Sequence, residues 1–139
     1  MRIQIISAVL VFCVPGVAHA QEPPNLVGVW KGSSLAVGSG ATPYRVLEGP
    51  GPVFFDQRME FTYTITEQKD SRFIGKMNSG KVSENVMGSF QPPAYSGGVI
   101  LADDGRYSFT MRDPSTMDLC YEHLYPKSKV VACFTLKKE

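Results

Sequence analysis

Two cysteines near the end of the chain, Cys120 and Cys133, constrain the fold more than any other feature of the sequence. If the segments that carry them form an antiparallel hairpin with the cysteines opposite each other, Tyr121 faces Ala132. Neighbouring residues in a strand point to opposite faces, so this register places the apolar residues on one face and both sulfur atoms on the other. The sequence therefore predicts a disulfide across a two-stranded ribbon that has one buried face.

The first 20 residues have the pattern of an export signal. Arg2 supplies the positive start, an apolar stretch follows over residues 3–14, and Ala18-His19-Ala20 forms a small-x-small cleavage site. The apolar stretch is shorter than the roughly 20 residues that a membrane span needs. We therefore expect residues 1–20 to be a cleaved signal peptide, and the mature protein to be periplasmic or secreted.

An exported location determines the chemistry that we expect of the two remaining cysteines. Disulfides persist in oxidising compartments, and closing a loop of this length stabilises a domain by about 3 kcal/mol. Redox-active pairs, the alternative, usually form a C-x-x-C turn at the start of a helix. Cys120 and Cys133 are far from that spacing, so we predict a structural disulfide.

Length and charge indicate one domain with no preference for nucleic acid. Removing the first 20 of the 139 residues leaves 119, which is enough for one domain and too few for two. The full chain has 14 Lys and Arg against 13 Asp and Glu, and Arg2 leaves with the signal. The mature chain is therefore neutral, has no basic stripe for a polyanion, and has no second apolar run that would form a transmembrane segment.

The hydrophobic pattern of the mature chain has the period of β-strands. Phe61, Tyr63 and Ile65 alternate with polar residues, as do Tyr107 and Phe109. No window combines helical spacing of apolar residues with a capping signal. Eight strands are predicted, near residues 27–35, 58–68, 71–79, 83–90, 97–102, 105–112, 115–123 and 129–137.

Most connections between these strands are short and carry turn residues, of which Asp104-Gly105 is the strongest hairpin signal. Strands joined by tight turns pair with their neighbours in sequence, and eight are enough to close a small barrel without exposed edges. One long connection, rich in Gly and Pro, is predicted over residues 36–57, where it folds over the barrel mouth. The predicted fold of residues 21–139 is all-β: one eight-stranded antiparallel up-and-down meander barrel with one disulfide.

Gly28-Val29-Trp30 in the first strand, the eight-strand meander and the long first loop together resemble the calycins, which are lipocalin-like and avidin-like barrels with a G-x-W motif. The resemblance implies that Trp30 closes the barrel base and that Gly28 lets the chain pass close by. Lipocalins place a late Arg against this Trp, where the present chain offers only Lys137 and Lys138. The chain also resembles small exported proteins of alphaproteobacteria, which implies a Gram-negative periplasm and no particular activity.

Catalytic chemistry has little support in the sequence. Once the signal is removed, His123 is the only histidine, so histidine-based hydrolysis would depend on it alone. The predicted register places His123 on the apolar face near a strand end, which suits a partly buried side chain with a hydrogen-bond partner. A metal site needs three or four ligands, and oxidised cysteines supply none. We therefore expect a non-enzymatic protein with no cofactor and no metal, and keep hydrolysis at His123 as a minor alternative.

Inward-facing aromatic residues are the better candidates for a site. They either fill a solid core, as in many small barrels, or bring tyrosine hydroxyls together in a pocket with a polar tip. The leading hypothesis is that the barrel binds a small apolar or amphipathic molecule. The predicted ligand-binding residues are Trp30, Tyr44, Arg45, Tyr63, Tyr107, Tyr121 and His123.

A second hypothesis comes from the loops. Tyr44, Tyr95 and Tyr125 fall in or beside predicted connections that are rich in Pro or Gly. In this reading the barrel core is solid and the loops contact another protein. The chain would then be a protein-interaction module, such as an inhibitor or a host-facing secreted factor.

Overall fold

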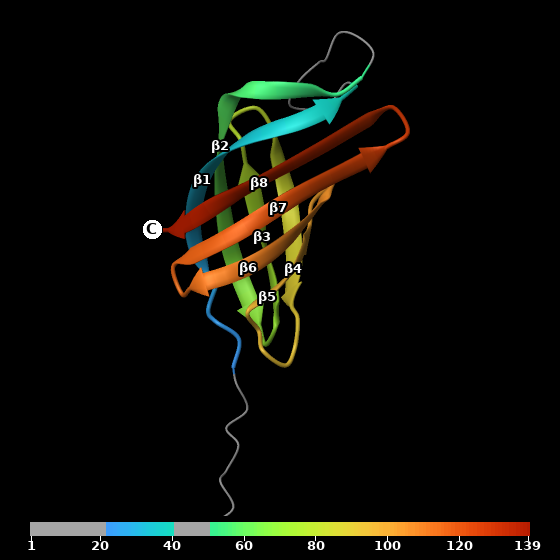
Figure 1. Cartoon of the computed structure of the whole chain (residues 1–139). Helices are drawn as coiled ribbons and strands as arrows, with labels where there is room; N and C mark the ends of the chain where they lie inside the picture. The colour runs from blue at the N-terminus through green and yellow to red at the C-terminus, as the bar shows by residue number, and fades with distance from the viewer. Residues whose placement is uncertain (1–21, 41–50) are drawn as a thin grey trace, which may run out of the picture.

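The protein is described here by a computed structural model that covers residues 22–40 and 51–139 (Figure 1). These residues form eight strands and no helix: β1 (Gly28–Ser39), β2 (Val53–Lys69), β3 (Arg72–Asn78), β4 (Ser83–Phe90), β5 (Gly97–Leu101), β6 (Arg106–Asp113), β7 (Thr116–Tyr125) and β8 (Ser128–Lys138). Each strand pairs antiparallel with the next, and β8 pairs with β1. The predicted up-and-down barrel is confirmed. The predicted signal peptide, residues 1–20, lies outside the described residues.

The hairpin of β7 and β8 has the predicted register. Cys120 pairs with Cys133 and Tyr121 with Ala132, and the two sulfur atoms are bonded at 2.05 Å. Tyr121 and Ala132 are buried, whereas Cys133 is exposed. The alternation of apolar and polar residues in both strands fixes this register, because a slip by one residue would turn the apolar set toward water.

The first connection is shorter than predicted. The expected loop over residues 36–57 is wrong at both ends, because β1 continues to Ser39 and β2 begins at Val53. Val37 pairs with Phe54, and Gly38 pairs with Val53. Gly38 is needed inside the strand, since a Cβ there would lie 2.6 Å from the carbonyl oxygen of Lys129 in β8. Because glycine has no side chain, the two strands can approach closely at this position. In the sequence alone, the same glycine is typical of a loop.

Trp30 fills the base of the barrel, the end at which β1 begins and β8 finishes. Its side chain is fully buried, and its indole N–H donates a hydrogen bond of 2.8 Å to the carbonyl oxygen of Leu26. Leu26 is also fully buried, and its backbone N–H donates to Oε1 of Gln68 at 2.7 Å. The segment before β1 therefore closes the base together with Trp30.

The half of the barrel toward the base is solid. Phe73, Phe90 and Phe109 meet edge to face with ring centres 5.2 to 6.1 Å apart, and Met77 and Leu119 are buried beside them. Such aromatic pairs add about 0.5–1.5 kcal/mol each to the free energy gained from burial. Any space for a ligand therefore lies toward the other end, the mouth, where the turns after β3, β5 and β7 are found. Among the described residues, no helix is long and apolar enough to cross a membrane.

Candidate functional site: an apolar cleft beside a polar cluster at the barrel mouth

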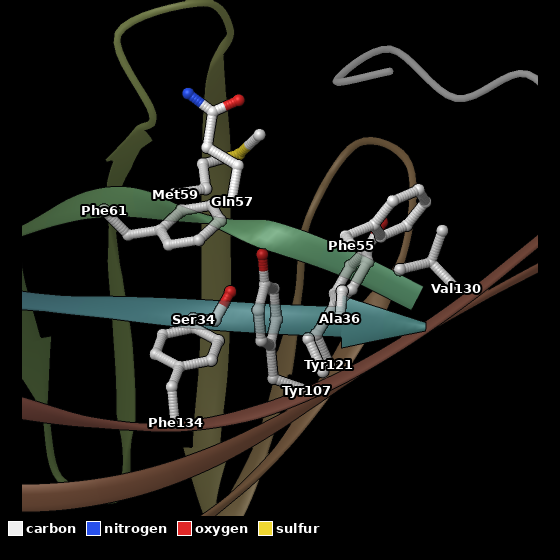
Figure 2. A pocket seen from close by; sticks show the side chains of 11 residues that line it. Ser34, Ala36, Phe55, Gln57, Met59, Phe61, Tyr107, Tyr121, Val130 and Phe134 are labelled. Atoms are coloured by element: carbon white, nitrogen blue, oxygen red, sulfur yellow. The ribbon is translucent and has the colours of Figure 1, made fainter. Parts of the chain in front are cut away.

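An apolar cleft opens near the mouth, between the upper parts of β1, β2 and β8 and the inner faces of β6 and β7 (Figure 2). Its volume is about 50 Å³. A water molecule needs about 10–15 Å³ by this kind of measure, so the cleft has room for about four groups of that size. This corresponds to one ring or a short alkyl chain. The lining residues are Ser34, Ala36, Phe55, Gln57, Met59, Phe61, Tyr107, Tyr121, Val130, Ala132 and Phe134.

Aromatic rings form the walls of the cleft. Phe61 and Phe134 are stacked, with ring centres 5.2 Å apart and an interplanar angle of 19°. Tyr107 and Tyr121 are tilted against each other at 4.8 Å. In Figure 2 the Tyr107 ring stands between the side chains of Ser34 and Tyr121. Flat apolar faces with a few hydroxyl groups are the usual lining of sites for small amphipathic molecules.

Small residues on two adjacent strands create the cleft. Ser34 and Ala36 in β1, and Ala132 in β8, occupy inward positions where the rest of the barrel carries large side chains. The pairing of β1 with β2 also shifts between Ser34 and Ala36. Such an irregularity bends the strands locally. The combination leaves space that the surrounding rings do not fill.

A polar cluster adjoins the cleft at the mouth. The Tyr121 hydroxyl donates a hydrogen bond of 3.0 Å to Oδ1 of Asp104, which lies in the turn between β5 and β6. Oδ2 of Asp104 lies 3.6 Å from Nδ1 of His123, and Nε2 of His123 lies 2.8 Å from the Ser128 hydroxyl oxygen. Within the described part of the chain, Oδ2 of Asp104 is buried and makes no hydrogen bond.

Both tyrosines of the cleft are held in their neutral form. Burial raises the pKa of Tyr107 well above its ordinary value, and the negative charges of Glu84 and Asp104 add to this, while a hydrogen bond from Tyr63 opposes it. Burial also raises the pKa of Tyr121, with further contributions from the charge of Asp104 and the hydrogen bond to it. The cleft wall therefore disfavours additional negative charge.

The structure brings only part of the predicted ligand-binding set together. Tyr107 and Tyr121 line the cleft, and Tyr63 meets the Tyr107 ring edge to face at 5.8 Å. His123 belongs to the polar cluster beside the cleft. Trp30 lies at the base and is not among the lining residues. Tyr44 and Arg45 lie outside the described residues.

Several lining residues were not anticipated from the sequence. Ala36, Phe55 and Gln57 fall in the stretch that was assigned to the first loop, and Ser34 is a small polar residue without an evident role. The available signal was the alternation of Phe55, Met59 and Phe61 with polar residues, which continues the pattern of β2 toward its start.

The Ser128, His123 and Asp104 side chains have the residue types of a hydrolytic triad, but their arrangement is that of a buried network. The Asp104–His123 separation of 3.6 Å exceeds a hydrogen bond, and both Ser128 and His123 are buried. Within the described residues, no group of three or more His, Cys, Asp or Glu side chains is placed to hold a metal ion.

Comparisons with known proteins do not assign the chain to a family. A scan against protein-family models found no match, and searches of curated proteins and of solved structures found no significant match either. The eight-stranded antiparallel barrel is consistent with a calycin-like fold. The functional conclusion therefore depends on the geometry of the site.

Proposed function

We propose that this protein is an exported, non-enzymatic barrel that binds a small apolar or amphipathic molecule in the cleft at its mouth. The observation that carries this proposal is an aromatic-lined cleft that opens beside a solid core. The Gly28-x-Trp30 start and the closed eight-strand meander support grouping it with calycin-like binding proteins. The proposed location is the periplasm or the cell exterior.

The volume of the cleft limits what enters it. About four methylene-sized groups fit inside, and each contributes about 0.8 kcal/mol when it leaves water. Their sum, about 3 kcal/mol, corresponds to an affinity in the millimolar range or weaker. A ligand that binds more tightly must therefore place only one end in the cleft, and make further contacts at the mouth.

A cleft-filling variant tests this proposal. Ala36→Leu places a larger side chain inside the cleft and reduces its free volume, whereas Val37→Leu, on the outward face of the same strand, leaves the cleft unchanged. We expect native mass spectrometry of protein purified from its own periplasm to show a copurifying small molecule in the wild type and in Val37→Leu. The molecule should be absent from Ala36→Leu. Equal loading of all three proteins, or none in any of them, would contradict the proposal.

A second candidate function, a protein-interaction module, is favoured by one observation on the outer face. Ile74, Met87 and Leu101 are direct cross-strand neighbours on β3, β4 and β5. With Val99 they form an apolar row whose side chains are each between 51% and 58% exposed. Contiguous exposed apolar residues often mark a protein contact.

Charge substitution in this row tests the second candidate. Met87→Lys should abolish a specific association that Ser83→Lys leaves intact, because Ser83 is an exposed position of β4 that pairs with Asn78 and not with a residue of the row. The association would be measured by pull-down with both variants in parallel. Equal recovery of the same partner by wild type and Met87→Lys would contradict a role for the row.

A further inference from the structure

We propose that the ligand of the cleft is a cationic amphiphile: an apolar chain or ring that enters the cleft, attached to a protonated amine that lies where Tyr121 meets Asp104. This inference rests on the proposed function and adds the charge of the ligand to it. Three features of the mouth carry it: the direction of one hydroxyl proton, the balance of buried charges, and the rings beside them.

The first feature is the hydrogen bond of Tyr121. Its hydroxyl proton is directed to Oδ1 of Asp104 at 3.0 Å, so the oxygen of Tyr121 presents lone pairs to other neighbours. A ligand nitrogen that carries hydrogen complements these lone pairs. A carboxylate on the ligand would meet them with its own lone pairs and find no donor in this hydroxyl group.

The second feature is an excess of acid among the groups that face the mouth. Glu84 is 5% exposed and the Asp104 side chain 14%, and the charges of both raise the pKa of Tyr121. In the described part of the chain, His123 is the only basic side chain that is buried with them. Arg106 and Lys129, on strands that pass nearby, are exposed on the outer face, where Arg106 pairs with Glu122.

One oxygen of this cluster also lacks a donor. Oδ2 of Asp104 is buried and accepts no hydrogen bond from the described residues. A buried carboxylate oxygen of this kind is costly unless a donor or a positive charge approaches it. Nδ1 of His123, 3.6 Å from this oxygen, is beyond hydrogen-bond distance, so a ligand ammonium beside Asp104 would supply the absent donor.

The third feature is the set of rings that surrounds the same place. Tyr107 and Tyr121 form one wall of the cleft with their ring centres 4.8 Å apart, and Phe55 lines it from β2. The faces of aromatic rings attract cations and favour apolar chains. A primary amine on a short alkyl chain therefore matches the cleft in size, polarity and charge.

A matched series of small probes tests the inference. The purified protein would be titrated at pH 7 and constant ionic strength with n-pentylamine, 1-pentanol and pentanoate, and binding followed by ligand-observed NMR. These probes share a chain that fits the cleft and differ in the charge of the head group. We expect pentylamine to bind at least tenfold more tightly than pentanoate, with pentanol between them.

Variants of two adjacent acidic residues test which carboxylate causes the preference for the amine. Asp104→Asn keeps the shape of the side chain and removes its charge, so it should weaken pentylamine binding about tenfold and leave pentanol within about twofold. Asp103→Asn is the control, because Asp103 lies in the same turn but is exposed and accepts from the backbone of Asn85. If Asp104→Asn does not fold, Tyr121→Phe serves instead. It should lower the affinity for pentylamine relative to pentanol.

The outcomes separate the two proposals. Binding of pentanol or pentanoate as tight as that of pentylamine would overturn the inference and leave the proposed function standing. An unchanged preference for pentylamine in the Asp104 variant, or in Tyr121→Phe if that variant replaces it, would also overturn it. Failure of all three probes to bind would remove the proposed function, and the inference with it.

Discussion

Lys138 reaches across the base of the barrel to Trp30, with its ammonium nitrogen 5.4 Å from the centre of the indole ring. The same nitrogen donates a hydrogen bond of 2.9 Å to the carbonyl oxygen of Asn25. The end of the last strand is thereby joined to the segment before the first one. Of Lys137 and Lys138, the two cations that the sequence offers at this end, Lys138 is the one that lies over Trp30.

Removal of the Trp30 side chain should therefore destabilise the barrel strongly. Trp30→Ala leaves a large cavity in a fully buried position, and such substitutions lower the free energy of unfolding by about 3–5 kcal/mol. Urea unfolding followed by circular dichroism measures the change. Leu124→Ala is the matched surface control, since Leu124 is 77% exposed, and we expect a change below about 0.5 kcal/mol. A similarly small change for Trp30→Ala would contradict its role at the base.

Reduction of the Cys120–Cys133 disulfide should lower the melting temperature by several degrees or more. The bond closes a loop of 13 residues in sequence, and the loss of this constraint on the unfolded chain costs about 3 kcal/mol. Differential scanning calorimetry with and without reductant measures the shift. The double variant Cys120→Ser and Cys133→Ser should melt at the lower temperature under both conditions, and identical melting of oxidised and reduced wild type would disprove the contribution.

Stability should fall at alkaline pH because of the two tyrosines in the cleft. In the unfolded chain a tyrosine titrates near 10.0, whereas the pKa values of Tyr107 and Tyr121 are raised in the folded barrel. The folded state thus retains protons that the unfolded state loses above about pH 10. The free energy of unfolding is unaffected below that pH, and decreases above it by up to about 1.4 kcal/mol per pH unit for each tyrosine.

Urea titrations between pH 7 and pH 11 measure this slope. Tyr107→Phe should reduce it, and Tyr125→Phe, at an exposed position, should leave it unchanged. Equal slopes in the wild type and Tyr107→Phe would show that the buried phenol does not contribute.

His123→Ala should affect stability and not catalysis. The substitution leaves the buried Ser128 hydroxyl without the imidazole that lies 2.8 Å away, and a buried polar group without a partner costs about 1–3 kcal/mol. Urea unfolding measures this loss. Hydrolysis of a p-nitrophenyl ester should proceed at the same rate with wild type and variant, whereas loss of hydrolysis in His123→Ala would support the hydrolytic alternative.

The sequence was sufficient to predict the barrel because local and long-range signals agree. Tyr121, Ala132 and the two cysteines allow a single register in which the apolar face is continuous, and the structure has that register. Short polar turns then force neighbouring strands to pair, and eight of them close the sheet. Each of these inferences depends on spacing along the chain, which is directly visible.

The cleft was harder to predict because it depends on contacts between distant segments. Gly38 has the local sequence context of a loop, and only the nearby carbonyl of Lys129 explains why a glycine is needed within the strand. Assigning it to a loop excluded Ala36 and Phe55 from the candidate site. Likewise, the local sequence around Asp104 indicates only a turn. Its hydrogen bond to Tyr121, 17 residues later, emerges only when the barrel is closed.

Among the described residues, the buried side chains of Trp30 and Leu26 close the base of the barrel, and the cleft lies toward the opposite end. If the proposed ligand enters and leaves through the mouth, substitutions around the mouth should change its association and dissociation rates together. Substitutions at the closed base should instead lower the lifetime of the folded state, without changing the rate at which the proposed ligand exchanges.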